Sequence, residues 1–112
     1  MTISNDILRG HTETIILNIL RQGDSYGYEI GKKILEASDG LVEFTEATIY
    51  IAFRRMEKEG LIASYWGDGV GGARRRYYTI TDYGLDVYRA QADNWKTISK
   101  TLNNLIGGDI ND

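Results

Sequence analysis

Hydrophobic positions within residues 45–60 recur every three or four residues, which predicts a helix with one buried stripe. The stripe consists of Ile49, Ala52, Phe53 and Met56. Thr45 precedes the run and can cap the first turn, while Gly60 is suited to end the helix. The opposite face carries Thr48, Ile51, Arg54, Arg55 and Lys58, so its basic side chains are predicted to face solvent together.

A β-hairpin is predicted directly after this helix. Residues 61–66 and 74–80 are rich in aromatic and β-branched side chains and favour two antiparallel strands. The segment between them matches the spacing GxGxxG at Gly67, Gly69 and Gly72. A dinucleotide-binding fingerprint requires a helix after these glycines. Because a strand follows here, we interpret the glycines as the tip of the hairpin.

Two further helices are predicted before residue 45. Residues 6–22 are expected to form the first, and its second half is apolar nearly all round, as if it touched both the core and a partner. Ser25 is the expected cap of the second helix, Tyr26 to Ala37. Gly27 and Gly31 lie four residues apart in it, and we expect a neighbouring helix to approach closely there.

A last helix is predicted from Thr81 and Asp82 to Ile106. Its apolar side chains follow a heptad register, which is typical of helix-on-helix pairing. The predicted interface residues are Leu85, Tyr88, Ala92, Trp95, Ile98, Leu102, Leu105 and Ile106. A small domain cannot easily cover so long a stripe, so we expect a symmetric homodimer built from this helix and the first one.

The charge distribution is uneven along the chain. The net charge of the 112 residues is −3, yet the window from Arg54 to Arg76 holds six basic and three acidic residues and is +3. The remainder, with seven basic and thirteen acidic residues, is −6. Attraction to phosphate depends on the field within roughly 8–10 Å. The acidic total therefore does not exclude DNA as a partner.

Several classes of protein are disfavoured. The chain has no cysteine and one histidine, His11, so neither a catalytic triad nor a histidine-rich metal site is expected. We expect no enzyme activity, no metal and no cofactor, and interpret His11 as a surface or interface residue rather than a pH switch. The chain shows neither a secretory signal nor about 18 consecutive apolar residues, which favours the cytoplasm and no membrane span.

These elements together predict a mainly α fold with a small β-hairpin (α+β): a winged helix-turn-helix with a long C-terminal dimerisation helix. Residues 1–80 are expected to form the DNA-binding domain, with residues 1–22 also in the dimer interface. Residues 81–107 form the C-terminal helix, and residues 108–112 a tail. The alternative is a winged-helix module that pairs with protein and does not contact DNA.

DNA contacts are predicted from the way a recognition helix enters the major groove, with its first residues at base edges and the wing at phosphates. Thr48, Tyr50 and Arg54 are assigned to base edges or adjacent phosphates, and Thr45 and Glu46 to further contacts. The residues assigned mainly to phosphates are Arg55, Lys58, Arg74, Arg75 and Arg76. Strand alternation must turn one or two of the three wing arginines away from the duplex. Tyr50 could equally belong to the core, and Tyr78 is expected there.

Several segments, in order and at characteristic spacing, resemble the PadR family of bacterial transcriptional regulators in its short form. They are SYGYEI from Ser25, ATIY from Ala47, RRMEKEGLI from Arg54, GGARRRYY from Gly71 and TITDYG from Thr79. Ile51 stands where many members have proline, and Ala47 where many have glycine. Both departures lie on the predicted recognition helix, so no operator sequence can be inferred.

The resemblance implies a homodimer that represses a nearby operon from an inverted-repeat operator of double-stranded DNA. In the multidrug-sensing branch, an aromatic-walled space at the dimer centre accepts planar hydrophobic compounds, and Trp95 matches a tryptophan of that wall. Trp95 could instead be a plain interface anchor. Further ligand candidates, chosen by predicted proximity, are Leu8, Thr12, Ile15 and Asn94.

Overall fold

Helix α4, Glu46–Lys58, lies at the centre of the fold and has the predicted bounds. Thr45 caps it: the side-chain oxygen accepts a hydrogen bond from the backbone N–H of Thr48 at 3.2 Å. All four residues of the predicted stripe are at most 2% exposed, so this prediction is confirmed. Gly60 follows the helix with φ of +79°, a left-handed conformation that suits glycine and ends the helix.

The computed structural model describes residues 1–107, apart from the side chain of Val70. The elements are α1 (Asn5–Leu8), α2 (Thr12–Leu20), α3 (Gly27–Ala37), α4, β1 (Ile62–Asp68), a 3-10 turn η1 (Val70–Gly72), β2 (Arg74–Ile80) and α5 (Asp82–Ile106). The predicted fold class is confirmed: mainly helical, with one two-stranded hairpin and a long C-terminal helix. The predicted tail, residues 108–112, lies outside the described residues.

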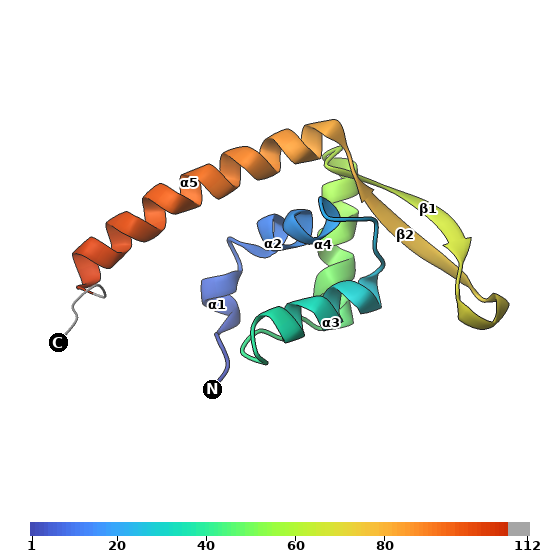
Figure 1. The fold of residues 1–112 in the computed structure, drawn as a ribbon, viewed down its shortest axis with the longest axis horizontal. Coiled ribbons are helices and arrows are strands. Elements are labelled where there is room, and N and C mark those ends of the chain that lie inside the picture. Colours follow the sequence, from blue (N-terminus) through green and yellow to red (C-terminus); the bar gives the residue numbers. More distant parts are fainter. Residues whose placement is uncertain (108–112) are drawn as a thin grey trace.

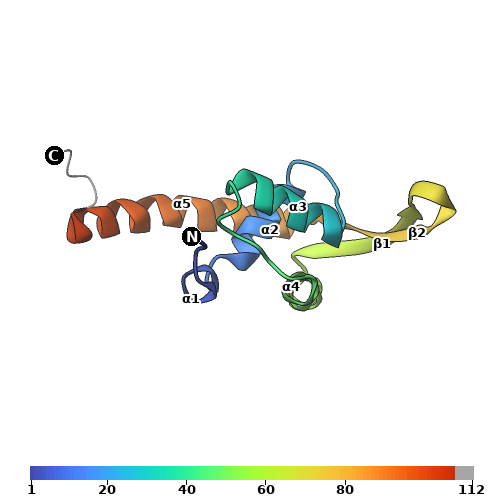
Figure 2. The ribbon, with the colours of Figure 1, turned by 90° about the horizontal axis from the view of Figure 1, so that it is seen from below.

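The helices α2, α3 and α4 enclose the core, and the hairpin and α5 project from it in opposite directions (Figure 1). The molecule is elongated, with principal extents of 56 × 31 × 21 Å. Figure 2 shows α4 nearly end-on below the other helices, so that one of its sides is uncovered. This arrangement leaves the outer face of α4 and the hairpin on the surface together.

The hairpin is joined to the core at its base. Its strands pair antiparallel, with Ile62 opposite Ile80 and Trp66 opposite Arg76. Tyr78 is 4% exposed and stacks on Phe53 of α4 with ring centroids 3.8 Å apart, which confirms its predicted place in the core. A further backbone bridge joins Ser25 to Tyr78. The distal half of the hairpin extends beyond these contacts as a wing.

The prediction of a single first helix over residues 6–22 is wrong. The chain forms two helices, α1 and α2, with a break at residues 9–11. Gly10 disfavours helix here. In the break, the N–H of His11 donates to the Leu8 carbonyl at 2.8 Å, and the Thr12 hydroxyl donates to the same carbonyl at 3.3 Å. The turn allows Leu8 to be buried at the edge of the core.

Helix α3 begins at Gly27 with Tyr26 as its N-cap, so Ser25 is not the predicted cap. Ser25 is fully buried, and its hydroxyl instead donates to the carboxylate of Glu29 at 2.6 Å. The predicted close approach of a second helix is confirmed. A Cβ atom on Gly27 would lie 3.1 Å from the hydroxyl of Tyr50 in α4, and one on Gly31 would lie 3.3 Å from Ile49.

Helix α5 has the predicted bounds and the predicted cap, since the Thr81 hydroxyl accepts a hydrogen bond from the N–H of Gly84 at 2.9 Å. Its first half packs on α2, and its C-terminal half extends past the other elements in both views (Figures 1 and 2). None of the helices within residues 1–107 is long and apolar enough to cross a membrane.

Candidate nucleic-acid interface and ligand groove

The outer face of α4 presents aromatic, apolar and basic side chains to solvent. Tyr50 is 47% exposed and Ile51 60% exposed, and Arg54 and Lys58 follow on the same side. Within residues 1–107, neither Arg54 nor Lys58 forms an ion pair. Both cations are therefore available to an anionic partner.

At the first turn of α4, Thr45 and Glu46 are exposed and Thr48 is partly buried. The hydroxyls of Thr45 and Thr48 lie 3.0 Å apart, so both are engaged at the cap. Tyr50 packs edge-on against Phe53, with centroids 5.9 Å apart, and its hydroxyl lies beside Gly27. The Tyr50 ring thus combines a contact to the core with an exposed edge.

Arg55 is held by a carboxylate from another helix. Its Nε donates to Glu13 of α2 at 2.7 Å, and the Arg55 side chain is 51% exposed whereas that of Glu13 is 23% exposed. The pair links α4 to α2. Arg55 therefore differs from Arg54 and Lys58, because its charge is already shared with a carboxylate.

The three wing arginines divide between the two faces of the hairpin, as strand alternation predicts. The guanidinium carbons of Arg74 and Arg76 lie 5.4 and 5.8 Å from the ring centroid of Trp66 on β1. The guanidinium carbon of Arg75 lies on the other face, 4.1 Å from the ring centroid of Tyr26. All three separations are within the range of cation–π interactions.

Arg76 also belongs to a polar network that joins the wing to α4. Its Nη2 donates to the hydroxyl of Ser64 at 2.8 Å and lies 3.6 Å from the carboxylate of Glu57. The Ser64 hydroxyl donates to the other oxygen of Glu57 at 2.8 Å. The face of the hairpin that carries Ser64, Trp66 and Arg76 is therefore the face turned toward α4.

The opposite face of the hairpin is fixed to the loop between α2 and α3. The Tyr65 hydroxyl donates to the carboxylate of Asp24 at 2.6 Å, and this hydrogen bond raises the pKa of Tyr65. Tyr77 lies between Tyr65 and Tyr26, with ring centroids 5.7 and 5.6 Å away. These contacts hold the orientation of the wing relative to the helices.

An open groove of about 640 Å³ lies between the N-terminal segment, α2 and α5. Three contacts join α2 to α5 along it: the Thr14 hydroxyl donates to Gln91 at 2.6 Å, the Tyr88 hydroxyl donates to Asn18 at 3.0 Å, and the rings of His11 and Trp95 meet edge-to-face at 4.8 Å. The groove is lined by Ile3, Ile7, Leu8, Gly10, His11, Thr14, Ile15, Asn18, Tyr88, Gln91, Ala92, Asn94, Trp95, Lys96 and Ile98.

Four of the five predicted ligand residues line this groove: Leu8, Ile15, Asn94 and Trp95. Thr12 does not line it, because its side chain is buried and bonded to the Leu8 carbonyl. Sequence reasoning missed His11 and Gln91 as lining residues. The signal for His11 would have been the helical spacing of positions 11, 14 and 18 at the start of α2, and the signal for Gln91 its place one turn from Tyr88 and Trp95 on α5.

The predicted dimer residues fall into two groups. Leu85, Tyr88 and Ala92 are partly buried within this chain. The more distal residues remain exposed: Trp95 at 44%, Ile98 at 41%, Leu102 at 43%, and Leu105 and Ile106 at 78%. Because α2 runs antiparallel to α5, an apolar stripe thus continues along α5 past the N-terminal start of α2.

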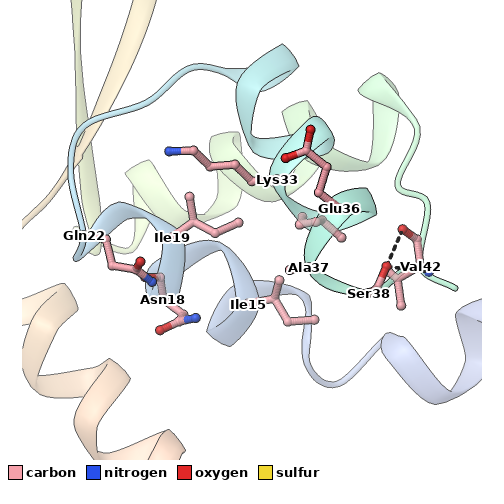
Figure 3. Close-up of a pocket in the computed structure, with 10 residues that line it drawn as sticks. Ile15, Asn18, Ile19, Gln22, Lys33, Glu36, Ala37, Ser38 and Val42 are labelled. Atoms are coloured by element: carbon pink, nitrogen blue, oxygen red, sulfur yellow. Dashed lines mark hydrogen bonds between the residues drawn. The ribbon is translucent and has the colours of Figure 1, made fainter. Parts of the chain in front are cut away.

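A second open groove, of about 620 Å³, lies between α2 and α3. Figure 3 shows Ile15 and Ile19 of α2 facing this space, with Ala37 and Val42 on the other side. Lys33, Glu36, Asn18 and Gln22 form a polar rim. Ile15 lines both grooves, so the two apolar surfaces are continuous through α2.

A two-stranded wing behind a capped, basic helix, followed by one long C-terminal helix, defines a winged-helix protein of the transcriptional-regulator class. The family model "Transcriptional regulator PadR-like family" matches residues 16–90. The chain belongs to the PadR-like family of transcriptional regulators.

Solved structures agree with this assignment. A transcriptional regulator from Clostridium thermocellum is 45% identical, with a TM-score of 0.83 over 92% of this chain and 97% of that one. A PadR-like regulator from Bacillus cereus is 37% identical, with a TM-score of 0.79 over 90% and 96%. Bacillus subtilis PadR, solved in complex with operator DNA, is 23% identical, with a TM-score of 0.66 over 73% of this chain and 46% of that one, a likeness of fold alone.

Proposed function

We propose that this protein is a homodimeric, sequence-specific DNA-binding repressor, and that a planar hydrophobic ligand weakens its binding to the operator. The observation that carries the proposal is the uncovered face of α4, where Arg54 and Lys58 lie unpaired among residues 1–107 beside an arginine-rich wing. Family membership supports the regulatory role. The operator complex of Bacillus subtilis PadR supports DNA as the partner of this fold.

In this proposal α4 enters the major groove with its N-terminal half toward the bases. Tyr50 and Ile51 offer apolar surface of the kind that contacts thymine methyl groups, and Arg54 can donate to guanine. Thr45, Glu46 and Thr48 lie at the capped end, where the helix N-terminus favours negative charge. Lys58 and the wing arginines are assigned to phosphates.

A second copy of the chain is proposed to cover the distal stripe of α5. Five large apolar side chains between Trp95 and Ile106 are 41–78% exposed, which is typical of an unfilled interface. Because a symmetric dimer uses the same surface on both chains, two recognition helices would face one side of the duplex. Half-sites are then expected about one helical turn, roughly 34–36 Å, apart as an inverted repeat.

The ligand is proposed to occupy the groove between α2 and α5, at the side of Trp95. The groove is apolar along Ile15 and Ile98 and carries a few polar groups, as small-molecule sites usually do. Helix α2 joins this groove to the DNA-binding face, because Thr14 binds Gln91 of α5 while its neighbour Glu13 binds Arg55 of α4. A shift of α2 on ligand binding would therefore move α4.

A titration of the DNA upstream of the protein's own gene tests the proposal. We expect the wild type to prefer that fragment over a shuffled one and Arg54→Ala to weaken the binding. The affinity should fall steeply with salt, with a log-log slope of about −0.9 per phosphate neutralised. Lys100→Ala, which removes the same charge from exposed α5, is the matched control. Equal affinity for both fragments at all salt concentrations contradicts the proposal.

The alternative, a winged-helix module that binds protein, draws support from the exposed Tyr50 and Ile51. It predicts no preference for any promoter fragment, even at low salt. The unpaired cations on α4, together with Arg74 and Arg76 on the face of the wing that is turned toward α4, favour DNA.

A further inference from the structure

We propose that the indole of Trp66 is a platform that holds Arg74 in the conformation in which it contacts a DNA phosphate. Trp66 is thus a positioning residue that acts through Arg74. The inference rests on the proposed function, and it adds an aromatic residue to an interface assigned from basic and helix residues alone.

The geometry on the wing supports this role. Trp66 lies opposite Arg76 in the strand register, and Arg74 precedes Arg76 by two positions in β2, on the same face. The guanidinium carbon of Arg74 lies 5.4 Å from the ring centroid, within the roughly 6 Å range of cation–π attraction. The indole therefore stabilises one orientation of a side chain that would otherwise sample many.

The two arginines beside Trp66 depend on it to different degrees. Arg76 is also fixed by the hydroxyl of Ser64 and the carboxylate of Glu57. Arg74 forms no side-chain hydrogen bond and no ion pair with any residue in the described part of the chain. Asp68 lies opposite Arg74 in the strand register, but its carboxylate is not within ion-pair distance of the Arg74 guanidinium. The ring of Trp66 is thus the contact that orders Arg74.

The position of Trp66 fits a role toward DNA. It is 56% exposed, although it is the largest side chain on the hairpin. It shares its strand face with Ser64, which is bonded to Glu57 of α4. A duplex lying on the outer face of α4 would meet this face of the wing. Trp66 and Arg74 would therefore face the same duplex as Arg54.

The chemistry of a stacked guanidinium explains the benefit. When the flat face of Arg74 lies on the indole, the N–H donors in its plane still point outward and can bind phosphate oxygens. Because the arginine is ordered before DNA arrives, less conformational freedom is lost on binding. The effect on affinity should match a cation–π contact at an exposed site, about two- to fivefold.

A pair of substitutions separates the ring's electrostatics from its bulk. Trp66→Leu keeps an apolar side chain but removes the π face, whereas Trp66→Phe keeps a smaller π face. We expect Trp66→Leu to weaken binding to the upstream DNA two- to fivefold and Trp66→Phe to recover part of it. The salt slope should stay that of the wild type in both variants, because no charge is lost, while Arg74→Ala lowers its magnitude by about one.

A double-mutant cycle tests whether Trp66 acts through Arg74. Adding Trp66→Leu to Arg74→Ala should cause almost no further loss of affinity. The matched control is Arg75→Ala, because Arg75 lies on the other strand face, 4.1 Å from Tyr26. In the Arg75→Ala background, Trp66→Leu should weaken DNA binding as much as it does in the wild type. Circular dichroism and the melting temperature of each variant establish that the hairpin is folded.

The outcomes are distinct. Wild-type affinity in Trp66→Leu, or an equal loss with and without Arg74, overturns the role of Trp66 while leaving the proposed function intact. If the wild type itself shows no preference for the upstream DNA, the proposed function fails, and this inference fails with it.

Discussion

The Nε of Arg55 in α4 donates a hydrogen bond to the carboxylate of Glu13 in α2, at 2.7 Å and across 42 positions of sequence. The next residue of α2, Thr14, donates to Gln91 of α5 at 2.6 Å. Two successive residues of one helix thus hold α4, with its proposed DNA-binding face, and the C-terminal helix. A single rigid element connects the two proposed sites.

The first prediction concerns this ion pair. Glu13→Gln removes a carboxylate that competes with phosphate for Arg55, so affinity for DNA at low salt should rise about two- to threefold. Because the pair is half-exposed, the free energy of unfolding should fall by less than about 1 kcal/mol. Fluorescence anisotropy of labelled upstream DNA measures the first effect and urea unfolding the second.

Glu59→Gln is the matched control, since Glu59 caps the C-terminal end of α4 and forms no ion pair within residues 1–107. It changes the net charge by the same amount. An equal gain of affinity in both variants would mean that the total charge, and not the release of Arg55, is responsible.

The second prediction concerns the junction of the wing and α5. A Cβ atom on Gly84 would collide with the Leu61 carbonyl oxygen and lie 2.9 Å from Ile80. Gly84→Ala should therefore lower the free energy of unfolding by about 1–3 kcal/mol, measured by urea unfolding at fixed protein concentration. Gly10→Ala is the control, because a Cβ there meets nothing within 4 Å. Equal midpoints for Gly84→Ala and the wild type would contradict the packing described.

The third prediction concerns stability in acid. The hydrogen bond from Ser25, aided by the nearby charge of Lys33, holds the pKa of Glu29 below its ordinary value of 4.5, although partial burial opposes this. The unfolded chain therefore binds this proton more readily than the folded protein does. The stabilisation is present above pH 4.5 and is lost as the pH falls through the lowered pKa.

Glu29→Gln should accordingly be less stable than the wild type at neutral pH, and the difference should shrink below pH 4.5. Unfolding in urea from about pH 7 to pH 3 measures it. Glu36→Gln removes a carboxylate from the exposed side of the same helix and serves as the control. A difference that stays constant across the whole range would contradict the role of the Ser25 bond.

The fourth prediction concerns the groove between α2 and α5. The planar dye proflavine should quench the emission of Trp95 in a saturable way when it enters this groove. In Trp66→Phe, where Trp95 is the remaining tryptophan, quenching should persist; in Trp95→Phe it should be lost. Quenching that survives in Trp95→Phe would place the dye elsewhere, on the side of Trp66.

The parts of the fold that could be predicted are those with local signals. The starts of helices α4 and α5 were predicted because Thr45 and Thr81 cap them, and the helices themselves because their apolar periods are unbroken. The break between α1 and α2 was missed, although Gly10 and the lack of apolar side chains between Leu8 and Ile15 interrupt the apolar pattern there. It depends on a tertiary effect, the burial of Leu8.

The residues of the candidate site could be predicted from the sequence, but most of their contacts could not. The basic face of α4 follows from helical period, and the split of the wing arginines from strand alternation. The partner of Arg55 is 42 residues away, and no local pattern predicts it. The contact of Trp66 with Arg74 depends on the hairpin register, which the glycine-rich turn leaves open in sequence.

The mass of the complex formed with the protein's own upstream DNA tests the central claim most directly. Native mass spectrometry, with a shuffled fragment of equal length in competition, gives the number of chains on each duplex. The proposal predicts two chains on the upstream fragment and almost none on the shuffled one. A single chain per duplex, or equal occupancy of the two fragments, would contradict it.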